Sequence, residues 1–166
     1  AQGRLEALMN YQTMVSDLTG MDISNASLLD EPTPAAEAMM LAKRVAKSKS
    51  NTFFVNSKTF KQTIAIIKSR AKPLGVEIEI GDRPDKGKEY FAAYFQYPNA
   101  EGSIEDLESV TKDIQAKGGL MIIGTDLLAL TLLKTPGDFG ADIAVGSAQD
   151  LVCQWDLGVH MQVLWQ

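Results

Sequence analysis

Residues 1–149 contain no cysteine, no histidine and no tryptophan. The one cysteine and the one histidine of the chain, Cys153 and His160, lie with both tryptophans in residues 150–166. Most of the chain therefore lacks the thiol and imidazole groups that serve as nucleophiles, general bases and metal ligands. We interpret Cys153 and His160 as unrelated residues of a tail rather than as a nucleophile–base pair. A single cysteine cannot form an internal disulfide, which fits a reducing compartment.

Three features that mark common binding functions are also missing. The net charge is −5 and the sequence has no basic stripe, so we expect no nucleic-acid partner. No apolar run is long enough to span a bilayer, so we expect no membrane association. Gly137 and Gly140 lack the Lys-Ser/Thr of a phosphate loop, which disfavours an unrelated nucleotide-binding domain.

Residues 1–4 have neither an initiator Met nor the apolar core of a signal peptide, and we expect an internal piece of a longer protein.

What the sequence does contain is an alternation of apolar strands with helices of ordinary length. At 166 residues the chain is long enough for one domain with a sizeable core. Strands that alternate with helices favour a mainly parallel sheet with flanking helices, an α/β fold. Apolar spacing predicts helices over 5–18, 35–47, 60–71, 104–114 and 127–133, and strands over 52–55, 76–80, 91–97, 120–123 and 141–145.

Polar residues follow three of the predicted strands, where ligands bind in open α/β sheets. They are Asn56-Ser57, Thr125-Asp126 and Ser147-Ala148-Gln149. Asp126 could hold a cation or a protonated ring nitrogen at this edge. It could equally cap a helix that starts at Leu127.

The other polar and aromatic clusters have simpler interpretations. We read Asp30-Glu31 as a solvated pair before a helix whose amino terminus favours negative charge. Glu105, Asp106 and Glu108 fit the acidic first turn of a helix, and no metal site is predicted. Four aromatic residues could suggest base stacking, but without accompanying Lys or Arg they fit a strand core: Phe91, Tyr94, Phe95 and Tyr97.

Several longer strings resemble the glycine decarboxylase P-protein family of the glycine cleavage system. They occur in the family's order and together cover residues 2–149. The strings are QGRLE (2–6), NYQTMV (10–15), NASLLDE (25–31), FQYP (95–98), EG (101–102), TDLLAL (125–130) and GADIAVGSAQ (140–149).

The resemblance implies a concrete function for the whole protein. P-proteins are large fold-type-I enzymes, and this chain would be part of the large domain of such a pyridoxal-phosphate enzyme. The family decarboxylates glycine and transfers the aminomethyl group to the lipoyl arm of H-protein. The cofactor is the electron sink for the carbanion that CO2 leaves behind. The family is mitochondrial in eukaryotes and cytoplasmic in bacteria.

The resemblance also places the chain in the amino-terminal half of the P-protein, which is a diverged copy of the catalytic half. The Schiff-base lysine belongs to the other half, and the corresponding place here, Ser147-Ala148-Gln149, has no lysine. We therefore predict no catalytic residue in this chain. Asp126 resembles the aspartate that pairs with the cofactor ring, in a copy that does not carry the cofactor. The candidates for residual cofactor contacts are Thr33, Asp126, Ser147 and Gln149.

Two departures from the family pattern fall near these candidates. The family usually has Gly and Ala where this chain has Pro32 and Pro34. Proline lacks the N–H and the backbone freedom that glycine offers, so we expect an altered loop between Glu31 and Ala35. The family commonly has His-Pro where this chain has Phe60-Lys61, which removes a polar side chain near a strand end.

The composition break divides the chain into a P-protein-like α/β domain, residues 1–149, and a tail, residues 150–166, that we interpret as out of frame. If one base is restored before residue 150, suitable codons for residues 150–162 read Phe-Gly-Val-Pro-Met-Gly-Leu-Gly-Gly-Pro-His-Ala, as the family does. The alternative is a divergent carboxyl terminus, since Val159, Met161, Val163 and Trp165 alternate like a strand face.

Two functions remain open at this stage. The first is a piece of glycine decarboxylase that is inactive alone, with glycine as substrate and with H-protein and the remaining half of the P-protein as partners. The second is a non-catalytic α/β interaction module that binds P-protein or H-protein. A longer coding sequence around this piece favours the first function.

The frameshift hypothesis predicts that the gene or transcript lacks one base between codons 147 and 155. Sequencing that stretch with high coverage tests it. An uninterrupted open frame that encodes residues 150–166 would show that the tail is genuine.

Overall fold

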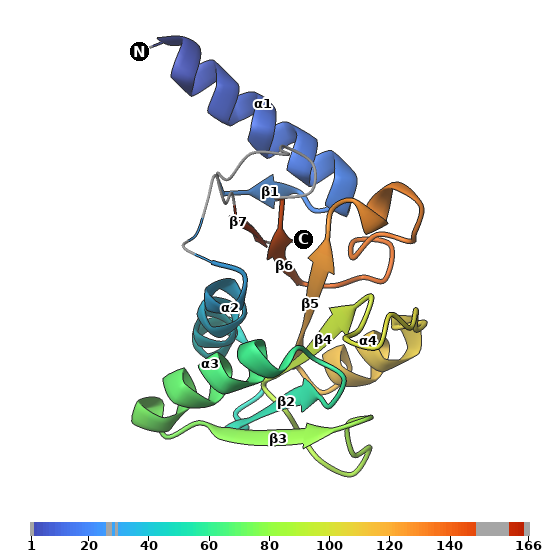
Figure 1. Cartoon of the computed structure of the whole chain (residues 1–166). Coiled ribbons are helices and arrows are strands. Elements are labelled where there is room, and N and C mark those ends of the chain that lie inside the picture. The colour runs from blue at the N-terminus through green and yellow to red at the C-terminus, as the bar shows by residue number, and fades with distance from the viewer. Residues whose placement is uncertain (1, 26–27, 29, 149–159, 165–166) are drawn as a thin grey trace.

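The computed structural model describes residues 2–25, 28, 30–148 and 160–164 (Figure 1). Helices and strands alternate along most of these residues. The α-helices are α1 (Gln2–Thr19), α2 (Pro32–Val45), α3 (Lys61–Ala71) and α4 (Glu108–Gln115), and the 3-10 helices are η1 (Lys72–Leu74) and η2 (Ala129–Thr131). The strands are β1 (Ile23–Ser24), β2 (Thr52–Asn56), β3 (Glu77–Gly81), β4 (Ala92–Tyr97), β5 (Leu120–Asp126), β6 (Ile143–Ser147) and β7 (His160–Leu164).

The strands form one seven-stranded sheet in the order β1-β7-β6-β5-β4-β2-β3. Strands β2 to β6 are parallel to one another, whereas β7 runs antiparallel to both β6 and β1. The predicted α/β fold with a mainly parallel sheet is therefore confirmed. Parallel pairing brings the carboxyl ends of β4, β5 and β6 to one edge, and this edge positions the candidate site.

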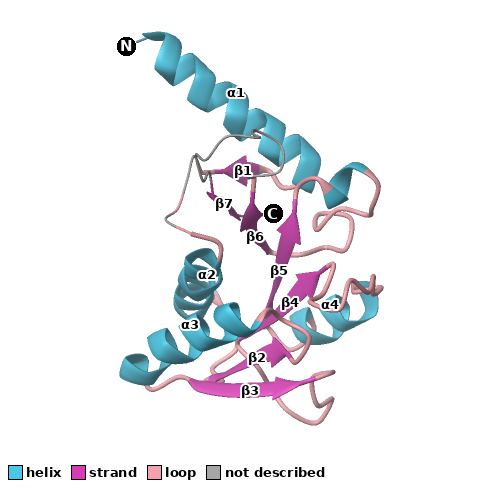
Figure 2. Ribbon diagram, viewed as in Figure 1, coloured by secondary structure: helices cyan, strands magenta, loops and turns pink. Residues whose placement is uncertain are grey.

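Helices cover both faces of the central sheet (Figure 2). Helices α2 and α3 pack together on one face, over an apolar cluster that includes Phe53, Phe91 and Ile122. Helix α4 and the carboxyl-terminal part of α1 cover the other face, where Phe54 and Ile123 are buried. Each such side chain contributes about 1.5–3 kcal/mol through burial. None of the helices within residues 2–25 and 30–148 combines the length and apolar character needed to cross a membrane.

Helix α1 is packed only toward its carboxyl end. Val15 and Thr19 are fully buried, while Leu5, Leu8 and Met9 are exposed, and the helix projects beyond the sheet (Figure 1). The helix ends as predicted at Gly20, whose φ of 69° suits glycine. The start of α2 also follows the prediction, because Pro34 lies within its first turn.

Some predicted elements need correction. The predicted helix over 127–133 is only a 3-10 turn, η2, because so short a segment gains little from helix formation on its own. No strand was predicted between residues 18 and 35, yet Ile23 and Ser24 form β1, for which β7 supplies an antiparallel partner. The alternation after Val159 fits the described strand β7, whereas residues 149–159, including the proposed frameshift boundary, lie outside the described residues.

The predicted acidic first turn of a helix is also partly wrong. Helix α4 begins at Glu108, and Asp106 precedes it and accepts the Glu108 N–H at 3.0 Å. Glu105 lies outside the helix and pairs with Lys58 and Arg83. Residues 103–107 belong to no helix or strand, and these side-chain contacts hold Glu105 and Asp106 in place instead.

Glu108 links α4 to a distant loop, because its carboxylate accepts hydrogen bonds from Lys112 at 2.7 Å and Lys134 at 3.0 Å. These bonds lower the pKa of Glu108 from its ordinary 4.5 to about 2. A carboxylate with a lowered folded-state pKa stabilises the fold above its ordinary pKa, and the contribution is lost as the pH falls toward the folded value.

We therefore expect Glu108→Gln to remove part of the acid dependence of stability between pH ~4.5 and ~2. Urea unfolding midpoints measured across this range would show a flatter profile than in the parent chain. Glu6→Gln removes an exposed carboxylate of α1 and serves as the control. Equal acid dependence in all three proteins would contradict the role of Glu108.

Candidate functional site

A pocket of about 350 Å³ lies at the carboxyl ends of β4, β5 and β6, and we call it the edge pocket. The sheet register explains its composition. Gln96 of β4 pairs with Gly124 of β5, and Asp126 of β5 pairs with Ser147 of β6, so polar residues distant in sequence meet at one edge. The lining residues are Glu31, Phe60, Gln96, Pro98, Asn99, Thr125, Asp126 and Ser147.

Beside this pocket, three residues of β4 and β5 pack tightly against one another: Tyr94, Gln96 and Gly124. The Tyr94 hydroxyl donates to Gln96 Oε1 at 2.9 Å in a fully buried position. A Cβ atom at Gly124 would overlap the Tyr94 hydroxyl and lie 2.8 Å from Gln96 Oε1, so only glycine fits here. Burial, with a smaller effect of the Glu31 charge, raises the pKa of Tyr94 far above its ordinary value. Tyr94 therefore remains a neutral donor.

The first turn of α2 forms one side of the edge pocket. The Thr33 N–H donates to Asp30 Oδ1 at 2.8 Å, and Glu31 lines the pocket. Pro32 and Pro34 have no N–H to offer. The predicted position of Asp30-Glu31 before a helix is confirmed, and Asp30 caps that helix start, but both residues are half-buried rather than fully solvated.

Asp126 lies on the opposite side, where it caps a turn and also lines the pocket. Its Oδ1 accepts the Leu128 N–H at 3.0 Å, which caps the turn that leads to η2. The same half-buried residue lines the pocket. The neighbouring Thr125 hydroxyl is buried and has no hydrogen-bond partner among the described residues.

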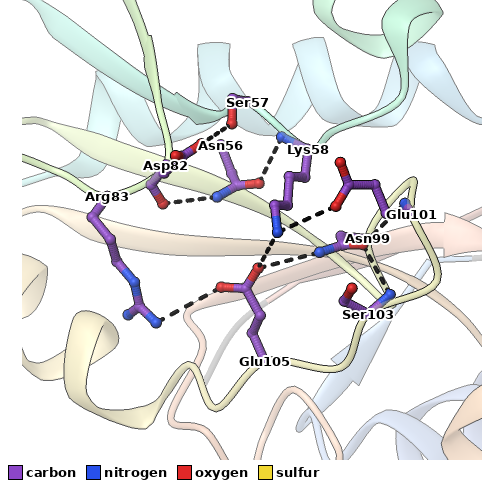
Figure 3. Close-up of polar contacts among 9 residues, drawn as sticks. All are labelled: Asn56, Ser57, Lys58, Asp82, Arg83, Asn99, Glu101, Ser103 and Glu105. Atoms are coloured by element: carbon purple, nitrogen blue, oxygen red, sulfur yellow. Dashed lines mark hydrogen bonds and ion pairs between the residues drawn. The ribbon is translucent and has the colours of Figure 1, made fainter.

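The rim near Asn99 is built by side-chain hydrogen bonds that fix the loop after β4 (Figure 3). Asn99 Oδ1 accepts the N–H groups of Glu101 and Ser103, both at 3.0 Å. Asn99 Nδ2 donates to Glu105 Oε1 at 3.2 Å. This one amide therefore organises the whole loop from residue 99 to 105.

Ion pairs then join this loop to the loops after β2 and β3 (Figure 3). Lys58 Nζ lies 3.3 Å from Glu101 Oε2 and 3.9 Å from Glu105 Oε1, and Arg83 Nη2 lies 3.7 Å from Glu105 Oε2. Asn56 Nδ2 donates to the Asp82 carbonyl at 3.0 Å. Asn56 and Ser57, which the sequence offered as strand-end polar residues, thus belong to this loop network and do not line the edge pocket.

The structure brings together only part of the predicted candidate set. Asp126 and Ser147 lie side by side in the pocket lining. Thr33 lies on the first turn of α2 and is not among the lining residues, and Gln149 lies outside the described residues.

Five lining residues were not predicted as site residues: Glu31, Phe60, Gln96, Pro98 and Asn99. Gln96 and Asn99 could have been predicted with the strand-end rule that led to Asp126. Gln96 lies near the end of the strand that precedes Pro98, and Asn99 follows that strand. Phe60 had been noted only as a departure from the family pattern. Its apolar phenyl ring stands where that pattern has the polar imidazole ring of histidine.

The edge pocket carries negative charge. Its lining includes the carboxylates of Glu31 and Asp126, and no Lys or Arg is among the described lining residues. A phosphate group would face these carboxylates and a helix start that has lost two N–H donors to proline. The pocket also offers no amine for a Schiff base. These residues fit a cation or a hydrogen-bond donor, and they do not fit pyridoxal phosphate.

A sequence model of the family described as Glycine cleavage system P-protein matches residues 1–158. The chain belongs to this P-protein family. The predicted family is confirmed over nearly the whole chain.

Curated P-protein relatives give the same result. The glycine dehydrogenases (decarboxylating) of Rhodopseudomonas palustris (strain BisA53) and Jannaschia sp. (strain CCS1) are each 54% identical to the chain, over 151 and 150 residues. Each match covers 90% of this chain and 16% of the relative. The chain therefore spans about one sixth of the length of these relatives, which are bacterial.

Solved structures share the fold of this chain. A crystal structure of glycine decarboxylase (P-protein), in inhibitor-bound form, superposes with a TM-score of 0.85 at 29% identity, covering 98% of this chain and 39% of that one. A methionine gamma lyase from Micromonospora echinospora shares the fold at a TM-score of 0.71 and 14% identity, covering 91% of this chain and 42% of that one. These neighbours are pyridoxal-phosphate-dependent enzymes of fold type I, as predicted.

The contact of Gly124 with Tyr94 yields a stability prediction for this P-protein segment. Gly124→Ala would force Tyr94 to move and should destabilise the chain by about 1–3 kcal/mol. Tyr94→Phe removes the overlapping hydroxyl but leaves Gln96 Oε1 without this donor, at a cost of about 1–3 kcal/mol. The double variant should lose less stability than the sum of the two single variants.

Urea unfolding of the four proteins measures this coupling. Gly3→Ala is the control, because a Cβ there meets nothing within 4 Å and alanine suits a helix. Strict additivity of the two substitutions would show that residues 94 and 124 do not share this contact.

Proposed function

We propose that these residues are part of the amino-terminal half of a P-protein that decarboxylates glycine and transfers the aminomethyl group to the lipoyl arm of H-protein. The support is the family match over residues 1–158 and the 54% identity to glycine dehydrogenases (decarboxylating). Glycine is then the substrate of the whole protein, and its partners are H-protein and the remaining half of the P-protein.

We propose further that this part of the protein does not carry out the chemical step. The observation behind this is the composition of the edge pocket, in which Glu31 and Asp126 supply negative charge and the described lining supplies no Lys or Arg. Pyridoxal phosphate, held by a lysine outside residues 1–166, would supply the electron sink for decarboxylation.

In the whole protein, the residues at the carboxyl edge of the sheet would then support the structure and determine the local charge. The Asn99 and Glu105 contacts fix the loops at the carboxyl edge of the sheet. The Tyr94 hydroxyl fills the space over Gly124 and leaves room for no larger residue there. A preorganised edge of this kind can support a neighbouring site without contributing a reacting group.

A second candidate function, a non-catalytic module that binds P-protein or H-protein, is favoured by α1. Leu5, Leu8 and Met9 are exposed on a helix that projects from the sheet, which is unusual for a self-contained domain. The two candidates are compatible if α1 contacts the rest of the same P-protein. They differ in whether a longer reading frame surrounds this piece.

The proposal predicts that the purified chain forms no internal aldimine with pyridoxal phosphate. Cofactor absorbance before and after borohydride reduction should show no stoichiometric, reducible adduct, and peptide mapping should find no single labelled lysine. The urea-unfolded chain and Lys58→Arg, which keeps the charge at the pocket rim, are the controls.

Unselective labelling would be equal in the folded and unfolded chains and would agree with the proposal. A stoichiometric adduct at one lysine of the folded chain alone would contradict it. That result would mean that these residues hold their own cofactor site.

A further inference from the structure

A second hollow, separate from the edge pocket, lies between α4 and the loop of residues 82–91 that joins β3 to β4. Parallel strands are usually connected by a helix that covers the sheet face, but here an irregular loop makes the crossing. Because a loop fills less space than a helix, it leaves a pocket of about 190 Å³, which we call the loop pocket. Its floor is apolar and consists of the buried residues Tyr90, Val110 and Ile114.

Hydrogen bonds hold the loop open in this shape. Tyr90 Oη accepts the Asp85 N–H at 3.1 Å and donates to Glu79 Oε1 at 2.8 Å. Lys117 Nζ, just beyond α4, donates to the carbonyls of Lys86 and Lys88, the second at 2.8 Å. The loop is thus fastened at Asp85, Lys86, Lys88 and Tyr90, so the pocket exists before any ligand binds.

Cationic residues outnumber anionic ones in the lining of the loop pocket, although Arg83 and Lys88 pair with Glu105 and Glu79 outside it. Four cationic residues, Arg83, Lys86, Lys88 and Lys117, and two anionic residues, Asp85 and Asp113, line it. The whole chain carries a net charge of −5. The ion pair of Lys86 with Asp113, at 3.1 Å, involves two exposed side chains, and such pairs are weak enough for a ligand to replace.

We propose that the loop pocket binds a small carboxylate that has an apolar body of about one ring. The apolar body would lie on Tyr90, Val110 and Ile114, and the carboxylate would take the ammonium group of Lys86 from Asp113. A bare inorganic anion would leave the apolar floor unused, and an amine would face the ammonium groups of Lys86 and Lys117. The site is independent of the edge pocket and of the proposed function.

Sodium benzoate is a suitable probe, with benzamide as its uncharged counterpart of the same shape. Titration of the isotope-labelled full chain at constant ionic strength should produce saturable amide shifts in residues 83–90 and 109–117. For a ligand of this size we expect a dissociation constant on the order of 1 mM. Benzamide should bind roughly fivefold more weakly, because it lacks the charge-assisted contact.

Two matched variants test the role of the rim. Lys86→Gln should weaken benzoate binding several-fold and leave benzamide binding unchanged. Lys72→Gln, which removes an exposed lysine of η1 outside the pocket, should change neither. Absence of saturable shifts in these two segments would overturn the proposal. Equal binding of the two probes, or equal effects of the two variants, would also overturn it.

Discussion

The parallel register of β2 to β6 is the constraint on which the rest of this structure depends. It places the carboxyl ends of β4, β5 and β6 at one edge, where Gln96, Asp126 and Ser147 meet. It also sets Gly124 against Tyr94, so that a single methyl group in β5 would disturb β4. Burial of the strands on both faces, by α2 and α3 on one side and α4 on the other, holds this register.

The two pockets differ in their origin and in the charged residues that line them. The edge pocket arises where strands end and collects carboxylates from the helix start and from β5. The loop pocket arises where a crossover lacks its helix, and Lys117 fastens the loop through its ammonium group. In a P-protein segment, the first supports the proposal that cofactor chemistry belongs to residues outside this chain, and the second is the proposed separate binding site.

Sequence periodicity predicted the elements whose formation depends on local pattern. The apolar run at Phe53-Phe54-Val55 and the aromatic residues of β4 are buried as predicted, because a parallel sheet covered on both faces needs continuous apolar strands. Sequence could not predict that Glu105 pairs with Lys58 and Arg83, since those partners lie on other loops. Nor could it predict the role of Glu31, whose position depends on where α2 packs. Asp126 could be predicted from its position at the end of a strand. That rule does not require knowing which residues lie beside it in the folded chain.

The central claim is that the edge pocket, built by this register, carries negative charge and therefore rejects phosphate-bearing ligands. Titration of the isotope-labelled chain with inorganic phosphate, followed residue by residue through its amide shifts, tests this claim most directly. The account predicts no saturable shifts at Gly124, at Leu128 or in the first turn of α2. Saturable shifts confined to these positions would contradict it, and would mean that the helix start and the strand ends form an anion site despite Glu31 and Asp126.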